Sequence, residues 1–321
     1  MRGSQGSSSA SERLIWNPAG SDRDLATACQ DLAAGRFRPA KDLLAATGRQ
    51  WDLRCYRMLL LAQAAAASAA VERWRSEEPD NLDAVVLQAR TAVIRAIRSQ
   101  REKHHSTPAL IELAEKSCLE AAQDAPGDPT PWVARLQLHV SAPEETTPRE
   151  LMAEVRRRDP WNREGFHRLL AAIGSASGGA VSDVFDMARW ASSNAPAGSP
   201  MHVLPLVAYV DGFQRESGDS ARARLINGDR QWAAVHARLD IERAYQSWFA
   251  SKARAGPTLL PDLHLMAHAL WKGGYFTDAK PVFEEIGRYA LTMPWSLHGQ
   301  AAEVFSRARE RCMRTPAPPS P

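Results

Sequence analysis

The feature that most constrains the fold is a proline that returns at nearly regular intervals. Four prolines stand where a run of helix-forming residues ends: Pro79, Pro126, Pro160 and Pro196. The last two intervals are 34 and 36 residues, and the first is 47. A proline ends a helix because its ring removes the backbone N–H and clashes with the preceding turn. A helix end that recurs at this period predicts a repeated helix–turn–helix unit.

The segments between these prolines are dominated by Ala, Leu, Arg and Glu, which favour helices. Apolar residues recur every three or four positions, as at Leu25, Cys29 and Leu32, so they share one helical face. No run of alternating β-branched residues indicates a strand. We therefore expect an all-α fold of roughly 13–15 helices, stacked as antiparallel hairpins with short loops.

Helix starts carry their own signals. Thr147 precedes a proline and is followed three residues later by Glu150, which is the pattern of a capping box. A hydroxyl residue before proline also predicts helix starts at three other places: Thr107-Pro108, Thr130-Pro131 and Ser199-Pro200. In each pair we expect the hydroxyl to be the N-cap and the proline to be the first helical residue.

Together these patterns resemble the tetratricopeptide repeat, a 34-residue helix–turn–helix with glycine at the turn and small or aromatic residues between the helices. The best match to its turn and second helix lies near the C-terminus, and a second lies near the N-terminus: Gly274, Phe276, Ala279 and Phe283; Gly35, Phe37, Ala40 and Leu44. Small and aromatic residues also precede three of the prolines at the expected distances: Ala67 and Trp74, Ala121, and Ala191. The Ala- and Arg-rich composition is similar to that of proteins from high-GC bacteria such as actinomycetes.

The resemblance implies a superhelix whose first helices line a concave groove that binds a protein or peptide partner. The family's groove positions fall here on residues of three repeats: Arg49, Asp52, Tyr56 and Leu59; Glu164 and His167; His264, His268 and Trp271. His264 and His268 share a helical face with Trp271 one turn beyond, so two imidazoles and an indole could contact a peptide. The same three residues could instead pack against the next hairpin.

Composition and loop-like stretches divide the chain into five expected parts. We expect disordered tails at residues 1–20, which are rich in Ser and Gly, and at residues 311–321, which are rich in Pro. Two blocks of helical repeats, residues 21–173 and 181–310, are expected on either side of a flexible loop at residues 174–180.

Charge and cysteine content exclude several classes of protein. A formal net charge of +3 over 321 residues gives no reason to expect a nucleic-acid partner. The four cysteines lie far apart, so neither a zinc finger nor a disulfide framework is indicated. No stretch predicts a membrane span or a signal peptide, and we expect a cytoplasmic protein.

No nucleophile elbow, Walker loop or dinucleotide-binding glycine pattern is present in the sequence. The leading hypothesis is thus a non-enzymatic adaptor or scaffold, with no catalytic residue, cofactor or metal expected. The alternative is an enzyme, or a protein that binds a small molecule or metal, on an all-helical scaffold with a site near residues 211–271. His264 and His268 have the i, i+4 spacing of two zinc ligands, but no third ligand is evident.

Overall fold

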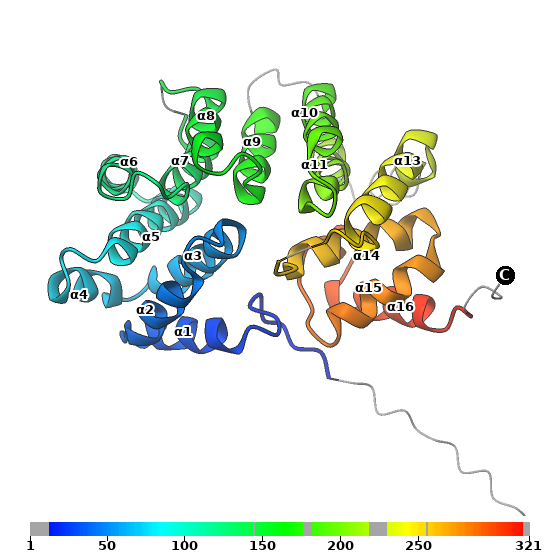
Figure 1. Ribbon diagram of the computed structural model, residues 1–321, viewed down its shortest axis with the longest axis horizontal. Coiled ribbons are helices and arrows are strands. Elements are labelled where there is room, and N and C mark those ends of the chain that lie inside the picture. The colour runs from blue at the N-terminus through cyan, green and yellow to red at the C-terminus, as the bar shows by residue number, and fades with distance from the viewer. Residues whose placement is uncertain (1–12, 144, 176–180, 218–229, 255, 317–321) are drawn as a thin grey trace, which may run out of the picture.

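A computed structural model describes residues 13–143, 145–175, 181–217, 230–254 and 256–316 (Figure 1). The expectation of an all-α fold is confirmed for these residues, which form helices and a single isolated bridge between Ile15 and Tyr289. The first nine helices are α1 (Arg23–Ala33), α2 (Arg38–Thr47), α3 (Trp51–Ala65), α4 (Ala70–Glu77), α5 (Leu82–Arg101), α6 (Thr107–Asp124), α7 (Thr130–Ser141), α8 (Pro148–Arg158) and α9 (Arg163–Ser175).

The remaining α-helices are α10 (Val181–Asn194), α11 (Leu204–Ser217), α13 (Val235–Ala244), α14 (Leu260–Gly273), α15 (Phe276–Ile286) and α16 (Ala301–Met313). Short 3-10 turns at Pro200–Val203 and Trp295–His298 and a π turn at Tyr245–Phe249 connect some of them. None of the helices in the described ranges has both the length and the hydrophobicity that a membrane span requires.

The recurring prolines stand at equivalent places in the fold. Each follows the last residue of an even-numbered helix by two positions: Pro79 after α4, Pro126 after α6, Pro160 after α8 and Pro196 after α10. Because the residue before a proline avoids the helical conformation, each helix must end at this point. The interval measured in the sequence is therefore the length of one helix pair with its connections.

Helices pack in chain order. From α1 to α9, each odd-numbered helix contacts the next odd-numbered helix, and the even-numbered helices lie on the outer side of this row. Figure 1 shows the row as an arch that runs from α1 past α6 and α8 to α11 and α13, with α14–α16 returning below. Packing between sequential hairpins is the arrangement that lets each unit cover its neighbour's apolar face.

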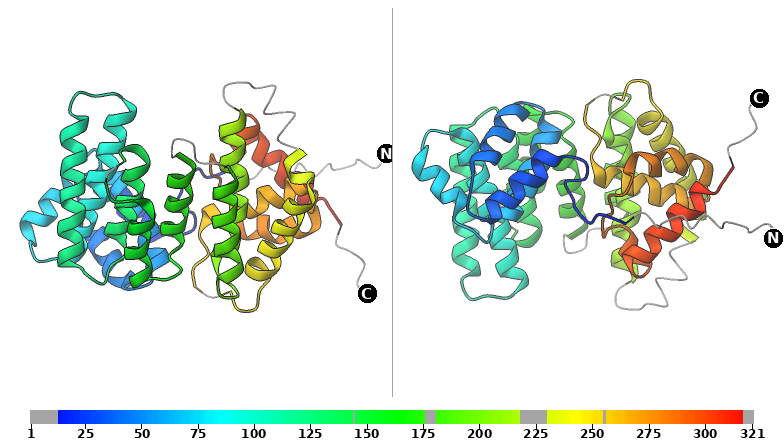
Figure 2. Two further views of the ribbon diagram at one scale, coloured as in Figure 1. Left: turned by 90° about the horizontal axis from the view of Figure 1, so that it is seen from above. Right: turned by 90° about the horizontal axis from the view of Figure 1, so that it is seen from below.

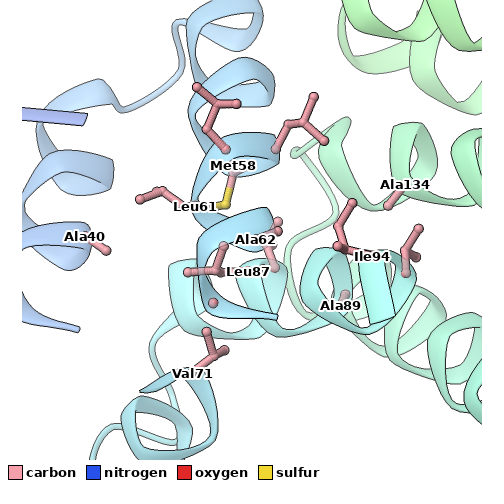
Figure 3. Close-up of a cluster of buried hydrophobic side chains, with 14 of the residues drawn as sticks. Ala40, Met58, Leu61, Ala62, Val71, Leu87, Ala89, Ile94 and Ala134 are labelled. Carbon is pink, nitrogen blue, oxygen red and sulfur yellow. The ribbon is translucent and has the colours of Figure 1, made fainter. Parts of the chain in front are cut away.

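The hydrophobic core follows the arch as three clusters. The first is built mainly from α1–α7, the second from α7–α11 and the third from α11–α16. In the first, alanines alternate with large side chains, so that Met58, Leu61 and Ile94 fill the space beside Ala62 and Ala89 (Figure 3). Small residues at these contacts allow the helix axes to approach closely.

The two best matches to the repeat pattern have the same turn geometry. Gly35, between α1 and α2, and Gly274, between α14 and α15, both have a left-handed backbone, with φ of 83° and 82°. Only glycine adopts this conformation without a steric penalty. Ala40 and Ala279, five residues after each glycine, are completely buried where the second helix meets the first.

Helix starts agree with the sequence in two of the four expected places. The side chain of Thr147 caps α8 in a capping box with Glu150, and Ser199 caps the turn that starts at Pro200. Helices α6 and α7 instead begin at Thr107 and Thr130, so these residues lie inside the helix and are not N-caps. At α7 the reason is local, because the carboxylate of Asp128 accepts from the backbone N–H of Thr130.

The expected tails begin in different places. Residues 13–20 are ordered: Ile15 donates to Arg288 O and accepts from Ala290 N, so this segment, which we call the strap, links α1 to the end of α15 (Figure 2). At the other end α16 continues to Met313, because Cys312 is buried in the third core cluster. Of the expected loop at 174–180, residues 174 and 175 still belong to α9, and residues 176–180 lie outside the described residues.

The contact between α8 and α9 yields a test of the packing. A methyl group on Gly165 would lie 2.9 Å from Cγ1 of Val155 and 3.3 Å from Sδ of Met152. We expect Gly165→Ala to lower the free energy of unfolding by about 1–2 kcal/mol, because overpacking exceeds the gain in helix propensity. Gly127→Ala is the control, since no atom lies within 4 Å of its added methyl group. Equal urea midpoints for the two variants would contradict this packing.

Candidate functional site

A concave feature made by residues from several parts of the chain lies where α3, α14 and the strap meet. Two adjoining cavities of about 260 Å³ and about 400 Å³ share four lining residues, Leu53, Pro257, Thr258 and Leu259. The first cavity extends to the start of α9 and to Trp248, and the second extends along the strap to Tyr289. We call the two cavities together the α3–α14 groove.

An ion pair between α9 and α14 lies at the wall of the first cavity. Nε and Nη2 of Arg163 each donate to a carboxylate oxygen of Asp262 at 2.6 Å. The side chains of Arg163 and Asp262 are only 5% and 1% exposed. Burial lowers the pKa of Arg163, but the charge and hydrogen bonds of Asp262 more than offset this and leave that pKa raised. Burial raises the pKa of Asp262, and the charge and hydrogen bonds of Arg163 oppose this rise. The pair joins residues that are 99 positions apart in sequence.

Asp52 completes this junction from α3. Its Oδ1 accepts from the backbone N–H of Arg163 at 2.9 Å and so satisfies a free donor at the start of α9. Burial raises the pKa of Asp52 to about 6; the hydrogen bond from Arg163 opposes this shift, and the nearby charge of Asp159 adds to it. Asp52 is therefore ionised at neutral pH, next to the cavity that it lines.

The second cavity is bounded by Tyr56 and Arg57 of α3. The hydroxyl of Tyr56 donates to the carbonyl of Pro18 at 2.5 Å, which attaches the strap to α3. Arg57 donates through Nε and Nη2 to Asp22 at 2.9 and 2.7 Å, and through Nη1 to Thr47 at 2.7 Å. These bonds place the side chains of α3 in fixed positions along the groove.

The structure places only some of the predicted groove residues at the α3–α14 groove. Asp52 and Tyr56 line the α3–α14 groove, whereas Arg49 is exposed beside Trp51, with its guanidinium 5.6 Å from the ring centre, and lines neither cavity. Glu164 and His167, together with Leu59 of α3, are covered by neighbouring helices. Packing between adjacent helices of the array therefore covers these groove positions.

Glu164 forms a buried charge cluster beneath the groove. It pairs with Arg168 at 2.5 Å and with Arg90 and Arg163 at 3.4 Å each. Burial raises the pKa of Glu164, but these arginines reverse the effect and lower it to about 2. His167 lies 3.9 Å from Asp262, and burial together with the charge of Arg163 holds its pKa well below 6.5. Both side chains stabilise the junction from inside.

His264 and His268 belong to the third core cluster and do not form an open patch. Nε2 of His264 donates to the carbonyl of Tyr289 at 3.1 Å, and its Nδ1 accepts from Nε1 of Trp295 at 2.7 Å. His268 meets Nε2 of His298 at 2.9 Å, and Trp271 is half-buried against the same rings. The packing interpretation of these residues therefore agrees with the structure, because hydrophobic burial on α14 covers this face.

Four important residues of the site were missed in the sequence: Arg163, Asp262, Trp248 and Arg254. Arg163 is the first residue of α9, but its partner is too distant in sequence for any spacing rule to connect them. Within the described ranges, no group of three or more His, Cys, Asp and Glu residues is placed to hold a metal ion. In comparisons with known proteins, no family model, curated protein or solved structure matches the chain.

The buried ion pair predicts a large and asymmetric mutational effect. Asp262→Ala leaves the guanidinium of Arg163 buried without its partner, and we expect a loss of about 3–5 kcal/mol in the free energy of unfolding. The double variant Arg163→Met with Asp262→Leu should lose less, because no charge remains buried.

Glu120→Ala provides the control, because its pair with Lys116 on α6 is exposed and 3.8 Å long; it should change stability by about 0.5 kcal/mol or less. Urea denaturation measures the free energy of unfolding of all three variants. A double variant less stable than Asp262→Ala would contradict the account of this pair.

Burial of His264 predicts loss of stability in mild acid. Burial lowers its pKa from 6.5 to about 4, so the unfolded chain binds a proton at higher pH than the folded one does. The contribution of His264 to the free energy of unfolding is therefore present above pH 6.5 and is lost as the pH falls towards 4.

Between pH 7 and pH 5 this residue should account for about 2 kcal/mol of lost stability. His264→Gln, whose amide can still accept from Trp295, should remove that part of the pH dependence. His105→Gln should leave it intact, because His105 is exposed. Identical pH profiles for His264→Gln and wild type would refute this assignment.

Proposed function

We propose that the chain is a non-enzymatic, tetratricopeptide-like helical-repeat protein that binds an extended segment of a partner protein in the α3–α14 groove. The observation that carries this proposal is the adjoining pair of cavities, which share Leu53 and residues 257–259. Two successive depressions along one path suit a chain segment that places side chains in both. A compact small molecule would instead need one enclosed cavity of similar total size.

The order of helix packing supports the repeat-like architecture in this proposal. Odd-numbered helices contact each other in chain order, and prolines follow the even-numbered helices at a constant distance. In such an array the first helices supply the binding surface. Here α3 does so through Leu53 and Tyr56, which line the groove from one helical face.

Residues 257–259 form the opposite wall of the groove and precede α14 directly. Leu259 is buried in the first core cluster, although it precedes a helix of the third. This anchor stabilises the wall against α3. A groove with a wall fixed in this way is largely formed before a ligand binds, which reduces the entropic cost of binding.

Peptide selection with a blocked variant tests this function. A library of random peptides displayed on phage is selected against the wild-type protein, and the clones are measured on Thr258→Trp and Lys116→Trp. Thr258 lines both cavities, so a tryptophan there should weaken binding at least about tenfold, which corresponds to about 1.4 kcal/mol.

Lys116 is exposed on α6, far from the groove in sequence, and its substitution should leave binding unchanged. Circular dichroism confirms that both variants stay folded. If no clones are obtained, or if the clones bind Thr258→Trp as tightly as wild type, the proposed function is wrong. Clones whose binding is weakened by Lys116→Trp and not by Thr258→Trp would place the interaction on the outer face.

A further inference from the structure

The charges that line the groove are paired with each other, with one exception. Seven charged residues line the two cavities, and six of them form three ion pairs: Arg163 with Asp262, Arg57 with Asp22, and Arg254 with Glu285. The distances in these pairs are 2.6, 2.7 and 3.0 Å. The seventh residue, Asp52, has no ion-pair partner in the described part of the chain.

The two arginines that line the first cavity together with Asp52 each pair with another carboxylate. The side chain of Arg163 donates to Asp262 through two nitrogens and to Glu164 through the third, and only its backbone N–H reaches Asp52. Arg254 is held by Glu285 and lies 4.7 Å from the ring centre of Phe249. The charge of Arg163 opposes the rise in the pKa of Asp52, and Nη1 of Arg254 has no hydrogen-bond partner in the described ranges. Within the described residues, however, neither guanidinium forms an ion pair with the carboxylate of Asp52.

The surroundings of Asp52 add further negative charge. The charges of Asp159 and Asp262 both raise the pKa of Asp52, and the charge of Arg163 lowers it. The side chain of Asp159 accepts from the amide of Asn162 at 2.9 Å, and no ion pair of Asp159 is present among the described residues. The first cavity is lined by two carboxylates and two guanidiniums, and of these four only Asp52 has no ion-pair partner within the described residues. A cation that enters this cavity would thus be attracted to Asp52, and the partly buried setting strengthens this attraction.

Two tryptophans provide aromatic surface beside Asp52. Trp51 and Trp248 line the same cavity as Asp52. Trp51 already contacts the guanidinium of Arg49, so its ring is in use as a cation–π acceptor. A basic side chain that reaches Asp52 would pass apolar aromatic surface with its methylene groups and place its charge at the carboxylate.

We propose that the segment bound in the α3–α14 groove carries a lysine or arginine whose side chain enters the first cavity and pairs with Asp52. This inference rests on the proposed function and names the chemical class of its ligand. The remaining groove contacts, through Leu53, Tyr56 and residues 257–259, hold the neighbouring part of the segment. Asp52 sets the preference for a basic residue, and the rest of the groove supplies contact area.

The test uses the peptides selected on the wild-type protein. Sequences that Thr258→Trp blocks should share a lysine or arginine at one position. Replacing that residue by glutamine in the peptide, or Asp52 by asparagine in the protein, should each weaken binding at least about tenfold. In the double-mutant cycle the two changes should not add, because they remove the same ion pair.

The asparagine variant is suited to this purpose because its Oδ1 can still accept from the backbone N–H of Arg163. Asp52→Asn should therefore remain folded, and its thermal midpoint is measured alongside. Asp24→Asn is the matched control, because Asp24 is exposed on α1 and lines neither cavity. It should leave peptide binding unchanged.

The outcomes separate this inference from the proposed function. If Thr258→Trp blocks peptides that carry no common basic residue, or that bind Asp52→Asn as tightly as wild type, the groove binds segments but the role of Asp52 is refuted. If additive losses are found in the cycle, the basic residue binds elsewhere and the pairing is likewise refuted. If no peptide is sensitive to Thr258→Trp, both proposals fall together.

Discussion

The buried ion pair of Arg163 and Asp262 is the interaction on which the arrangement of the molecule depends. It joins α9, from the middle of the chain, to α14, which belongs to the last core cluster. Two buried charges are tolerated only when each satisfies the other with good geometry, and here two parallel hydrogen bonds do so. The pair therefore acts as a geometric constraint, because only one relative placement of α9 and α14 leaves both charges compensated.

Packing between neighbouring helices also changes the role of the concave face. In an open array of hairpins the first helices would present their side chains to solvent, whereas here Glu164 is covered against α5 and His264 is covered by the residues that follow α15. The surface that remains lies at the edge of the junction, between α3 and the residues before α14. The same junction that removes the expected groove thus creates a smaller one, with Asp52 at its wall.

Much of the fold could be predicted from the sequence because its signals are local. Pro126 ends a helix, Gly35 and Gly274 permit a left-handed turn, and Thr147 with Glu150 caps a helix, and each effect involves only a few neighbouring residues. The site could be predicted only in part. Asp52 and Tyr56 were found through their place in the repeat, but their partners lie 111 and 38 residues away in the sequence.

By itself the sequence determined that the chain is all-α, where most helices end, and which alanines and aromatics face a neighbouring helix. Helical periodicity and turn chemistry act over one or two turns, so they can be read without a tertiary structure. Only the tertiary structure decided that the arch closes, that His268 faces the core, and that Asp52 alone among the groove's charged residues has no ion-pair partner within the described ranges. Charge pairing depends on distances between remote helices, and these follow from the summed packing angles of every hairpin between them.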